Sequence, residues 1–504
     1  MATMNVVKLT TTDGQAVEYV DQMIGQGGMK DVYFSPKKDY VVAFFRSKPD
    51  QALLDRLTMI SDTYRKRIFE QDGGDYWKQV FCWPTGMVKE GDRVGVVVPT
   101  YDKTFFFERG SRNNDMLNIK GKEKEGKWFA SANNRNRFID PVELGDWSTH
   151  LRMCIQLARA TRRMHYAGLS HSDLSYKNCL VDPKNGRACL IDLDGLVVPG
   201  KFPPDVVGTP DFIAPECVAT SHLDKNDPQR KLPSISTDQH ALAVLIYMYL
   251  LYRHPLRGKK MHDANDPQKD DALMMGKAAL FVEHPTDASN RINVKSARPS
   301  ELPWADTDKM PFTITGPYLS DLFKRAFIDG LHNPTRRPTA EEWETALVKT
   351  VDLIQPCTNP RCDQKWYVFD NSTKPVCPFC GTAHKGKLPV LNLYSSRTAG
   401  KFMPDNHRVM VYTNQSFFPW HASRLVMPNE KLKPEEKKRI GYFVNYGGSW
   451  WLVNEGMPDL TDKTDPNQDK PIPIGGKVEL VDGQKLLLSK ATGGRVVVVQ
   501  MVDA

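Results

Sequence analysis

The spacing of hydrophobic residues predicts a strand-rich first part of the chain with one helix. Residues 17–34 favour two strands around a glycine-rich turn, and residues 40–46 favour a short apolar strand. Residues 50–71 carry apolar positions at helical spacing, just after a proline. Residues 81–98 predict a hairpin across a Lys-Glu-Gly-Asp turn. The expected order is therefore three strands, one helix and two strands.

The pattern changes twice beyond this first part. Residues 105–138 are polar, basic and rich in asparagine, which favours an extended surface insertion over a basic docking site for an acidic partner. Helical patterns dominate from residue 144 to residue 353, and short strands return after residue 408. The predicted boundaries are 1–101, 102–353 with the insertion at 105–138, 354–384, a linker at 385–404, and 405–504.

Composition and charge exclude some classes of protein. The chain has 504 residues and a formal net charge of +8, a small surplus that makes a nucleic-acid partner unexpected. Its longest apolar run, residues 241–252, is too short to cross a bilayer and predicts a buried helix. The first residues lack a charged-then-apolar signal pattern. We therefore expect a soluble, cytoplasmic protein without a membrane partner.

Two short segments have the layout that phosphoryl transfer needs. HSDLSYKN spans residues 171–178, and IDLDG spans residues 191–195. One carboxylate can orient the acceptor hydroxyl, while an amide and a second carboxylate hold Mg²⁺ (or Mn²⁺) on the nucleotide phosphates. Asp173 is the candidate base, and Asn178 and Asp192 are the candidate metal ligands. Asp194 either assists Asp192 or is itself the ligand.

Together with GTPDFIAPE at residues 208–216, these segments resemble the protein kinase superfamily, whose motifs read HRDLxxxN and DFG. The resemblance implies an α+β fold with two lobes, an N-lobe over 1–101 and a C-lobe over 102–353. It also implies an ATP-dependent and Mg²⁺-dependent transfer of the γ-phosphoryl group to a protein substrate.

The nucleotide is expected to lie between a glycine loop and a hinge. Gly25 and Gly27, in IGQGGMKDVY, let backbone amides approach phosphate because no Cβ intervenes. The hinge that would receive the adenine falls near Pro99 and Tyr101.

The lysine that contacts the phosphates is not in its usual place. The third strand reads VVAFFR, so Phe45 stands where most kinases carry lysine. Lys30, on the second strand, is similar to the lysine of the with-no-lysine kinases, and we expect it to contact the α- and β-phosphates. The alternatives are Arg46 or Lys48, or no residue at all. The carboxylate partner of this lysine stays open among three residues of the predicted helix, Asp55, Asp62 and Glu70.

The resemblance suggests an acceptor type and argues against one form of regulation. Lys177 is placed to neutralise the moving phosphoryl group, and Thr209 favours serine or threonine as the acceptor. Ser172 stands where many kinases carry an Arg that grips an activation-loop phosphate. Residues 195–207 contain no Ser, Thr or Tyr, so phosphorylation of this stretch is not the switch. Two framework interactions are also expected, a Glu216–Arg337 pair and support of the catalytic loop by Asp238.

The nine cysteines include one set with metal-ligand spacing. Four of them, Cys357, Cys362, Cys377 and Cys380, form two knuckles, the second of which reads CPFCG. Tetrahedral Zn²⁺ suits four thiolates, and the module is too small to have a core of its own. We therefore expect a structural zinc ribbon over residues 354–384, with the other cysteines reduced and buried.

The tail resembles the forkhead-associated β-sandwich, through GGSWWLVN and the strands that follow it. That fold often binds phosphothreonine through an Arg, a Ser and an Asn, but His421, Ser423 and Arg424 occur here in a different order. The alternative is a sandwich used for packing or for protein contacts.

The combination of modules also resembles bacterial kinases of the tellurite-resistance TerY-associated type. This resemblance implies a signalling or stress-response role, with a phosphatase and a von Willebrand-type domain protein as partners. Two other functions remain open. A pseudokinase scaffold is favoured by the missing third-strand lysine. A small-molecule kinase is suggested by IDLD, although GTPDFIAPE and the large C-lobe argue against it.

Overall fold

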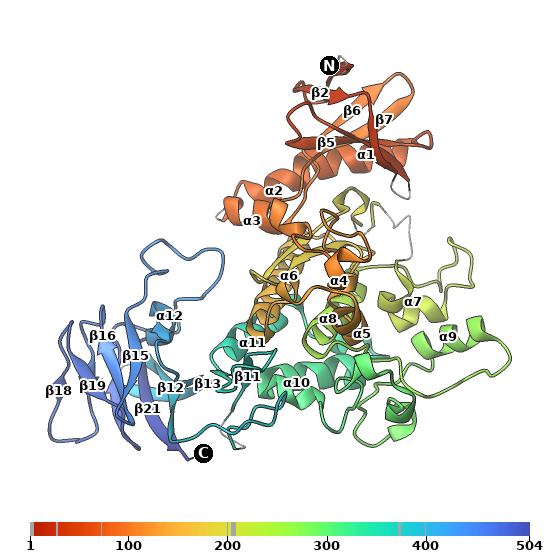
Figure 1. Ribbon diagram of the computed structural model, residues 1–504. Coiled ribbons are helices and arrows are strands. Elements are labelled where there is room, and N and C mark those ends of the chain that lie inside the picture. Colours follow the sequence, from red (N-terminus) through yellow and green to blue (C-terminus); the bar gives the residue numbers. More distant parts are fainter. Residues whose placement is uncertain are drawn as a thin grey trace. The chain divides into compact units, whose positions relative to one another are not determined.

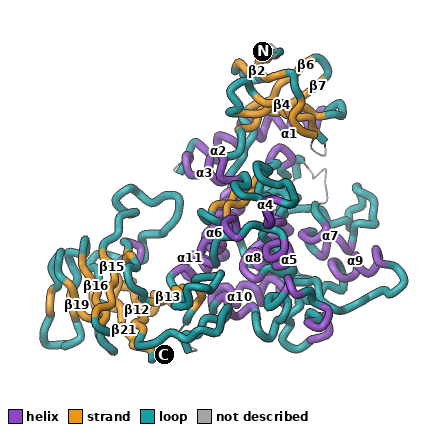
Figure 2. Tube along the Cα trace, viewed as in Figure 1, coloured by secondary structure: helices purple, strands orange, loops and turns teal. Residues whose placement is uncertain are grey.

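The computed structural model describes residues 5–26, 29–71, 73–198, 200–202, 208–370, 374–398 and 400–503. The chain forms two compact units (Figures 1 and 2). Unit 1 comprises residues 1–145, 149–311 and 322–344, and unit 2 comprises residues 146–148, 312–321 and 345–504.

Unit 1 begins with a five-stranded antiparallel sheet and a helix. The strand order is β3-β4-β5-β7-β6, with β3 Met23–Gln26, β4 Lys30–Phe34, β5 Tyr40–Phe45, β6 Gly86–Glu90 and β7 Arg93–Pro99. The helical segment between β5 and β6 consists of α1 Gln51–Met59, a π-helical turn Ile60–Tyr64, α2 Arg65–Phe69 and α3 Gly74–Val80. The predicted order of three strands, a helix and two strands is found in this sheet, but residues 17–20 of the predicted first strand lie outside it. A hairpin of β1 Val6–Thr10 and β2 Ala16–Val20 precedes it.

Helices dominate the chain from residue 112 to residue 351. They are α4 Arg112–Asp115, α5 Ala132–Arg137, α6 Trp147–Tyr166, α7 Pro215–Ala219, α8 Ile235–Leu251, α9 Pro267–Met275, α10 Pro317–Lys324 and α11 Ala340–Val351. The hairpin of β8 Cys179–Asp182 and β9 Arg187–Leu190 interrupts them. Helix α8 is buried around its whole circumference from residue 240 onward, which confirms the helix predicted from the long apolar run.

The segment 105–138 is not the extended surface insertion expected from its composition. Phe105, Phe107 and Phe129 are buried, and the segment folds into short turns with α4 and α5. Lys124 is also buried, with Nζ 2.9 Å from a carboxylate oxygen of Glu143. The expectation failed because the aromatic anchors are spaced irregularly among polar residues, so no helix or strand period reveals them.

Unit 2 contains two antiparallel sheets. One has the order β13-β12-β21-β20-β17-β18 and the other has the order β14-β15-β16-β19. The first consists of β12 Leu388–Thr398, β13 Lys401–Met410, β17 Thr461–Asp462, β18 Lys470–Pro471, β20 Lys485–Leu487 and β21 Arg495–Val502. The second consists of β14 Ser416–Phe417, β15 Gly441–Tyr446, β16 Ser449–Asn454 and β19 Lys477–Glu479. The short helix α12 Pro419–Ala422 follows β14. The likeness to the forkhead-associated fold stays a prediction.

The predicted linker at 385–404 is wrong. Within this range, residues 388–398 form β12 and residues 401–404 begin β13, and β12 lies between β13 and β21 inside its sheet. Leu388, Val390 and Leu391 of β12 are buried in the core of the unit, which draws residues from both sheets. The apolar run LPVLNL is the signal that the linker interpretation overlooked.

The cysteine-bearing module packs into the same core. Its hairpin is formed by β10 Ile354–Pro356 and β11 Trp366–Val368. Tyr367, Cys362 and Cys377 belong to the hydrophobic cluster that also contains the sandwich residues. The module and the sandwich therefore form one unit, where the sequence predicted two modules joined by a linker.

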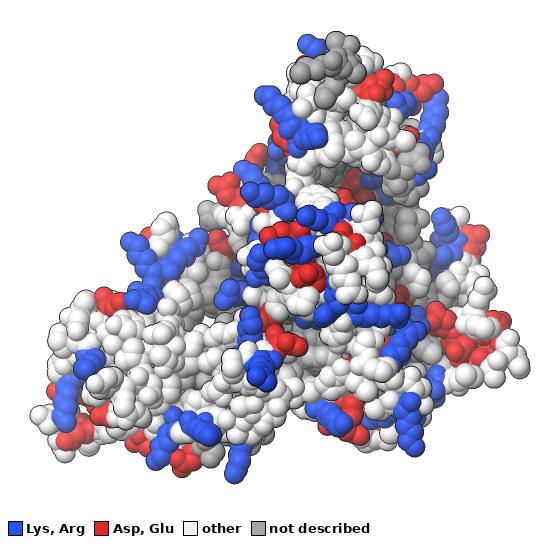
Figure 3. Space-filling view, in the orientation of Figure 1, with Lys and Arg blue, Asp and Glu red and all other residues white. Residues whose placement is uncertain are grey.

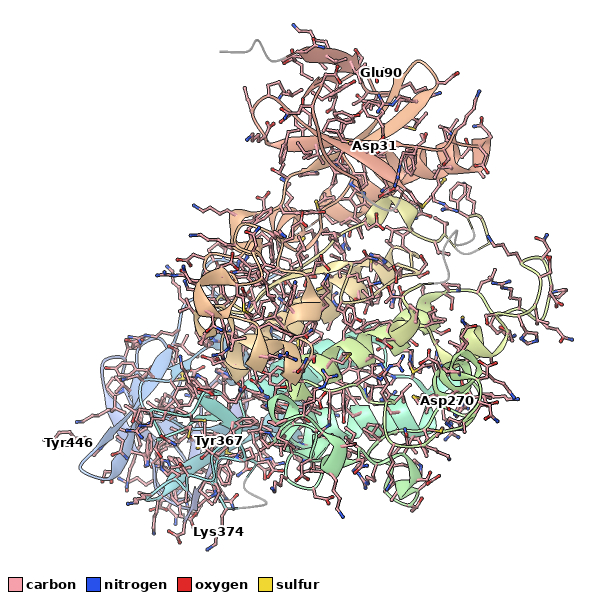
Figure 4. All side chains as sticks on the ribbon, turned by 45° about the vertical axis from the view of Figure 1, so that its right-hand side comes forward. Asp31, Glu90, Asp270, Tyr367, Lys374 and Tyr446 are labelled. Atoms are coloured by element: carbon pink, nitrogen blue, oxygen red, sulfur yellow. The ribbon has the colours of Figure 1, made fainter. Side chains whose placement is uncertain are left out.

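Tyr446, by contrast, is 82% exposed and projects from the end of β15 (Figure 4).

A buried carboxylate joins three segments of unit 2. Asp352, just after α11, contacts two imidazoles. Its Oδ2 lies 2.6 Å from His407 Nε2, and its Oδ1 lies 3.1 Å from His421 Nε2. Burial alone would raise the pKa of Asp352, but His421 and His407 outweigh it and hold the pKa below its ordinary value. The ionised form of Asp352 therefore contributes to the stability of the unit.

The described residues contain no helix with the length and apolarity needed to cross a bilayer. On the face shown in Figure 3, Lys and Arg side chains lie among Asp and Glu side chains.

We predict that Asp352→Asn lowers the free energy of unfolding of unit 2 by about 2 kcal/mol at pH 7, because two charge-assisted contacts are lost. The pKa of Asp352 is lower in the folded protein than in the unfolded chain. Its contribution to the free energy of unfolding is therefore complete above the unfolded-state pKa of about 4 and declines below it. Urea unfolding of wild type and variant at pH 7 and at lower pH should show the difference narrowing below pH 4. The exposed Glu435→Gln serves as the control. A difference that stays constant with pH would contradict the assignment.

Candidate active site and metal centre

Lys30 begins strand β4, and its side chain lies beside Phe45 of β5. The two residues are direct partners in the antiparallel register, so their side chains leave the same face of the sheet. Lys30 Nζ lies 5.2 Å from the centre of the Phe45 ring. The Lys30 side chain is 17% exposed, and Phe45 is buried. The sheet therefore places an ammonium group beside the strand position that carries lysine in most kinases.

The carboxylates of the IDLDG segment neutralise this ammonium group. Lys30 Nζ lies 2.7 Å from Oδ1 and 2.6 Å from Oδ2 of Asp194, which is buried. It lies 3.3 Å from Oδ1 of the more exposed Asp192. Burial by itself would lower the pKa of Lys30, but the charges of Asp194 and Asp192 outweigh it and raise that pKa. Lys30 is therefore charged at neutral pH.

The same balance keeps Asp192 ionised. Loss of hydration would raise its pKa, but Lys30 and His171 outweigh that effect and lower the pKa below its ordinary value. Its backbone has a φ of 59°, in the left-handed region, at the point where the chain leaves β9 and turns. The structure thus brings two acidic groups and one basic group of the predicted site together.

The helix carboxylates considered as partners of Lys30 lie elsewhere. Asp55 is hydrogen-bonded within α1, Asp62 pairs with Lys66 at 2.7 Å, and Glu70 is exposed. Among the described residues, Lys30 makes its ion pairs only with the IDLDG segment. Sequence reasoning missed this pairing, and the second acidic residue of IDLD was the signal that could have indicated it.

The candidate base and the candidate amide ligand contact each other. Asn178 Nδ2 donates to Asp173 Oδ2 at 2.9 Å and to the Asp173 carbonyl at 3.0 Å. The backbone N–H of Thr209 donates to Asp173 Oδ1 at 2.6 Å. The Asn178 amide oxygen has no hydrogen-bond donor among the described residues, so it remains available as a ligand. Ser172, next to Asp173, has a φ of 64°.

Buried polar groups hold the segment of the candidate base in place. Asp238 Oδ2, on α8, accepts the backbone N–H of His171 at 2.7 Å and lies 3.2 Å from His165 Nε2. His171 Nε2 lies 3.0 Å from the carbonyl oxygen of Ile191, so this nitrogen donates. The predicted support by Asp238 is confirmed, and the imidazole links the segment to the strand end before Asp192.

The expected ion pair between Glu216 and Arg337 is also confirmed. Arg337 is buried, and two of its guanidinium nitrogens lie 2.8 and 2.7 Å from the two oxygens of Glu216. The guanidinium also donates to the carbonyls of Gly330 and Leu331. A bidentate pair with its remaining donors satisfied fixes the start of α7.

The other residues predicted for the site belong to the glycine loop, the catalytic-loop lysine position and the hinge. Gly27 lies outside the described residues. At Gly25, no heavy atom of the described residues lies within 4 Å of the position that a Cβ would take. Lys177 is exposed. Pro99 and Tyr101 line a pocket of about 430 Å³ whose other walls come from α2, α3, β9 and neighbouring loops, without the groups around Lys30. The adenine-binding role of Pro99 and Tyr101 therefore stays a prediction.

The donor set fits a hard divalent cation. Asp192 and Asp194 offer carboxylate oxygens, and Asn178 offers an amide oxygen, which are the ligands that Mg²⁺ and Mn²⁺ prefer. The backbone N–H of Ile191, next to Asp192, donates to the carbonyl of Asn178, so these ligands come from adjacent chain segments. The arrangement therefore offers a metal ion carboxylate and amide oxygens beside one ammonium group.

The four cysteines with metal-ligand spacing converge in unit 2. All four Sγ atoms lie within 4.8 Å of one another. Cys357 Sγ lies 3.5 Å from Cys380 Sγ, and Cys362 Sγ lies 3.9 Å from Cys377 Sγ. Four thiolates around one Zn²⁺ at the usual Zn–S length would be separated by about 3.8 Å. The cluster therefore fits a closed, structural zinc site.

Hydrogen bonding prepares one of these thiols for metal binding. Burial opposes ionisation of Cys380, but hydrogen bonds from Thr382 outweigh it and lower the pKa of the thiol to about 6. A thiolate at neutral pH is the form that binds metal.

Comparison with known proteins supports a kinase domain. The family model of the protein kinase domain matches residues 134–346, which supports the protein kinase superfamily for this part of the chain. A Toxoplasma gondii virulence factor, described as having a protein-kinase fold and no enzymatic activity, is 13% identical with a TM-score of 0.40, over 69% of this chain and 84% of that one. The kinase domain of a Toxoplasma gondii rhoptry antigen is 17% identical with a TM-score of 0.35, over 54% and 77%. No curated protein matches this sequence.

We predict one zinc ion per chain and its loss in Cys377→Ser, because a hydroxyl is a poor substitute for a buried thiolate. Removing zinc should lower the free energy of unfolding of unit 2 by about 3 kcal/mol, since metal binding stabilises only the folded form. Metal content by mass spectrometry and denaturant unfolding with and without chelator measure both effects. The buried Cys154→Ser, in α6, is the control and should keep its zinc. Full zinc content in Cys377→Ser would contradict the site.

Proposed function

We propose that the protein is an ATP-dependent and Mg²⁺- or Mn²⁺-dependent protein kinase that transfers the γ-phosphoryl group to a serine or threonine of a protein. The observation that carries this proposal is the buried ammonium group of Lys30, held between Asp194 and Asp192. Asp173 and Asn178 lie in the segment that His171 links to the same strand end. A scaffold that binds no nucleotide would not need these groups together.

Each residue has a role that its surroundings support. Asp173 accepts the proton of the acceptor hydroxyl, and the Thr209 N–H holds its carboxylate in position. Asn178 and Asp192 hold the metal ion, with Asp194 as a further ligand; the ion neutralises phosphate charge. Lys30 contacts the α/β-phosphates.

The proposal gives roles to Lys177 and to the glycine loop as well. Lys177, exposed in the catalytic segment, neutralises the transferred group. Gly25 and Gly27 cover the phosphates.

We expect nucleotide binding to loosen the Lys30–Asp194 pair. Both Asp194 oxygens are within 2.7 Å of the ammonium group, so phosphate that competes for the lysine would make that carboxylate a better metal ligand. The nucleotide therefore supplies one anion to Lys30 and releases another toward the metal ion.

Thr209 and its surroundings support the proposed serine or threonine specificity and the proposal that loop phosphorylation is not the switch. Thr209 is buried and its hydroxyl donates to Ser175 Oγ at 3.2 Å, which supports a structural role for this hydroxyl and not a regulatory phosphosite. With no hydroxyl side chain in residues 195–207, control would come from partners or from unit 2. A bacterial stress-response system with a phosphatase and a von Willebrand-type domain protein is the proposed setting.

The alternative is a pseudokinase scaffold that binds nucleotide or partners without transfer. One observation favours it, namely that Phe45 fills the usual lysine position. The two proposals differ in a single measurable step, which is the appearance of phosphate on a protein acceptor.

We predict phosphate transfer from labelled ATP to a generic protein acceptor, or to the chain itself, in the presence of Mg²⁺. Asp173→Asn should lower kcat by about 10²- to 10⁴-fold, because the hydroxyl proton loses its acceptor. Lys30→Met and Asp192→Asn should lower kcat/KM by a similar factor. Lys37→Met, an exposed lysine in the β4–β5 turn, should leave transfer unchanged. Transfer that survives Asp173→Asn would exclude this site, and nucleotide binding without transfer would favour the scaffold.

A further inference from the structure

Phe45 fixes the place of an ammonium group that comes from another strand. Its ring is buried in a cluster with Ala43, Leu57 and Met87, so its orientation is set by packing. Lys30 is its direct cross-strand partner, with Nζ 5.2 Å from the ring centre. An ammonium group this close to an aromatic face is attracted by the negative face of the ring, most strongly where water is excluded.

Helix α1 does not supply the group that usually orients a kinase lysine. In the general pattern, a lysine on the third strand pairs with a glutamate of this helix. Here α1 turns a cation toward the interior, since Arg56 is buried and its guanidinium carbon lies 5.9 Å from the centre of the Phe202 ring. The anionic partner of Lys30 comes from Asp194 instead.

A lysine in this position needs a rigid support. The side chain has four rotatable bonds, and Asp194 attracts it only until a nucleotide competes. An aromatic ring holds the ammonium group without forming an ion pair, so it keeps the lysine in place while the anion beside it changes. An aliphatic side chain of similar volume would fill the space without attracting the charge.

We propose that Phe45 is the positioning residue of Lys30, and that it takes the place of the helix carboxylate when a nucleotide displaces Asp194 from the lysine. The inference rests on the proposed role of Lys30 as the phosphate-binding lysine. The site then works without a carboxylate from α1, so a shift of that helix would not make or break the ion pair of the lysine.

The test is a double-mutant cycle of Phe45→Leu and Lys30→Met. The probe is the non-hydrolysable ATP analogue adenylyl imidodiphosphate with Mg²⁺, and its Kd is measured by calorimetry. We expect Phe45→Leu to weaken binding about fivefold in the wild-type background and to have no effect when Lys30 is already methionine. An equal loss in both backgrounds would show that the ring only packs, and would overturn the proposal.

Phe44→Leu is the matched control. Phe44 is the neighbouring buried ring on the opposite face of β5, where it packs with Val17 and Tyr19. The variant should lower stability but leave the Kd unchanged. Three further variants, Asp55→Asn, Asp62→Asn and Glu70→Gln, should also leave the Kd unchanged. A loss of affinity in any of the three would restore a helix partner for Lys30.

If the wild type binds no nucleotide, urea unfolding of the same four proteins tests the proposal. The effect of Phe45→Leu on the unfolding equilibrium constant should then be about fivefold larger with Lys30 present than with Lys30→Met. Equal effects in the two backgrounds would overturn the proposal. Kinase activity is tested separately. Coupling without phosphate transfer contradicts the proposed function alone, and transfer without coupling contradicts only the role of Phe45.

Discussion

The burial of one ammonium group constrains the whole candidate site. A charge removed from water is costly unless an opposite charge and hydrogen bonds replace the solvent, so Lys30 can be inside only where Asp194 meets it. This ion pair connects β4 to the segment that follows β9, and both elements carry residues of the proposed site. Because a cation needs only to reach its anion, the neighbouring strand can carry the lysine, and Phe45 can occupy the vacated position.

The segment 171–178, which carries the candidate base, is held by buried charges more than by regular secondary structure. Asp238 receives a backbone N–H of this segment, and the Glu216–Arg337 pair fixes the start of α7. Such contacts allow an irregular backbone, including the left-handed conformation of Ser172, to keep one geometry. The same logic applies in unit 2, where the ionised Asp352 joins β13 and α12 to the end of α11.

The cysteine module illustrates how a very small element is stabilised. It has too few apolar residues for a core, so two of its four cysteines lie in the hydrophobic cluster of the neighbouring sandwich. Metal binding and sandwich packing therefore stabilise the same unit. This coupling explains why the chain between them is a long, buried strand, β12, and not a flexible connection.

Hydrophobic period and motif spacing in the sequence were enough to predict the strand and helix order of the first part, the buried helix α8 and the convergence of the four cysteines. The Glu216–Arg337 pair was predicted from the resemblance to protein kinases. Tertiary structure alone decided that Asp194 neutralises Lys30, that 105–138 is anchored by buried aromatic rings, and that 385–404 forms strands. Each of these depends on contacts between segments far apart in sequence, and no local pattern encodes which partner meets a buried charge.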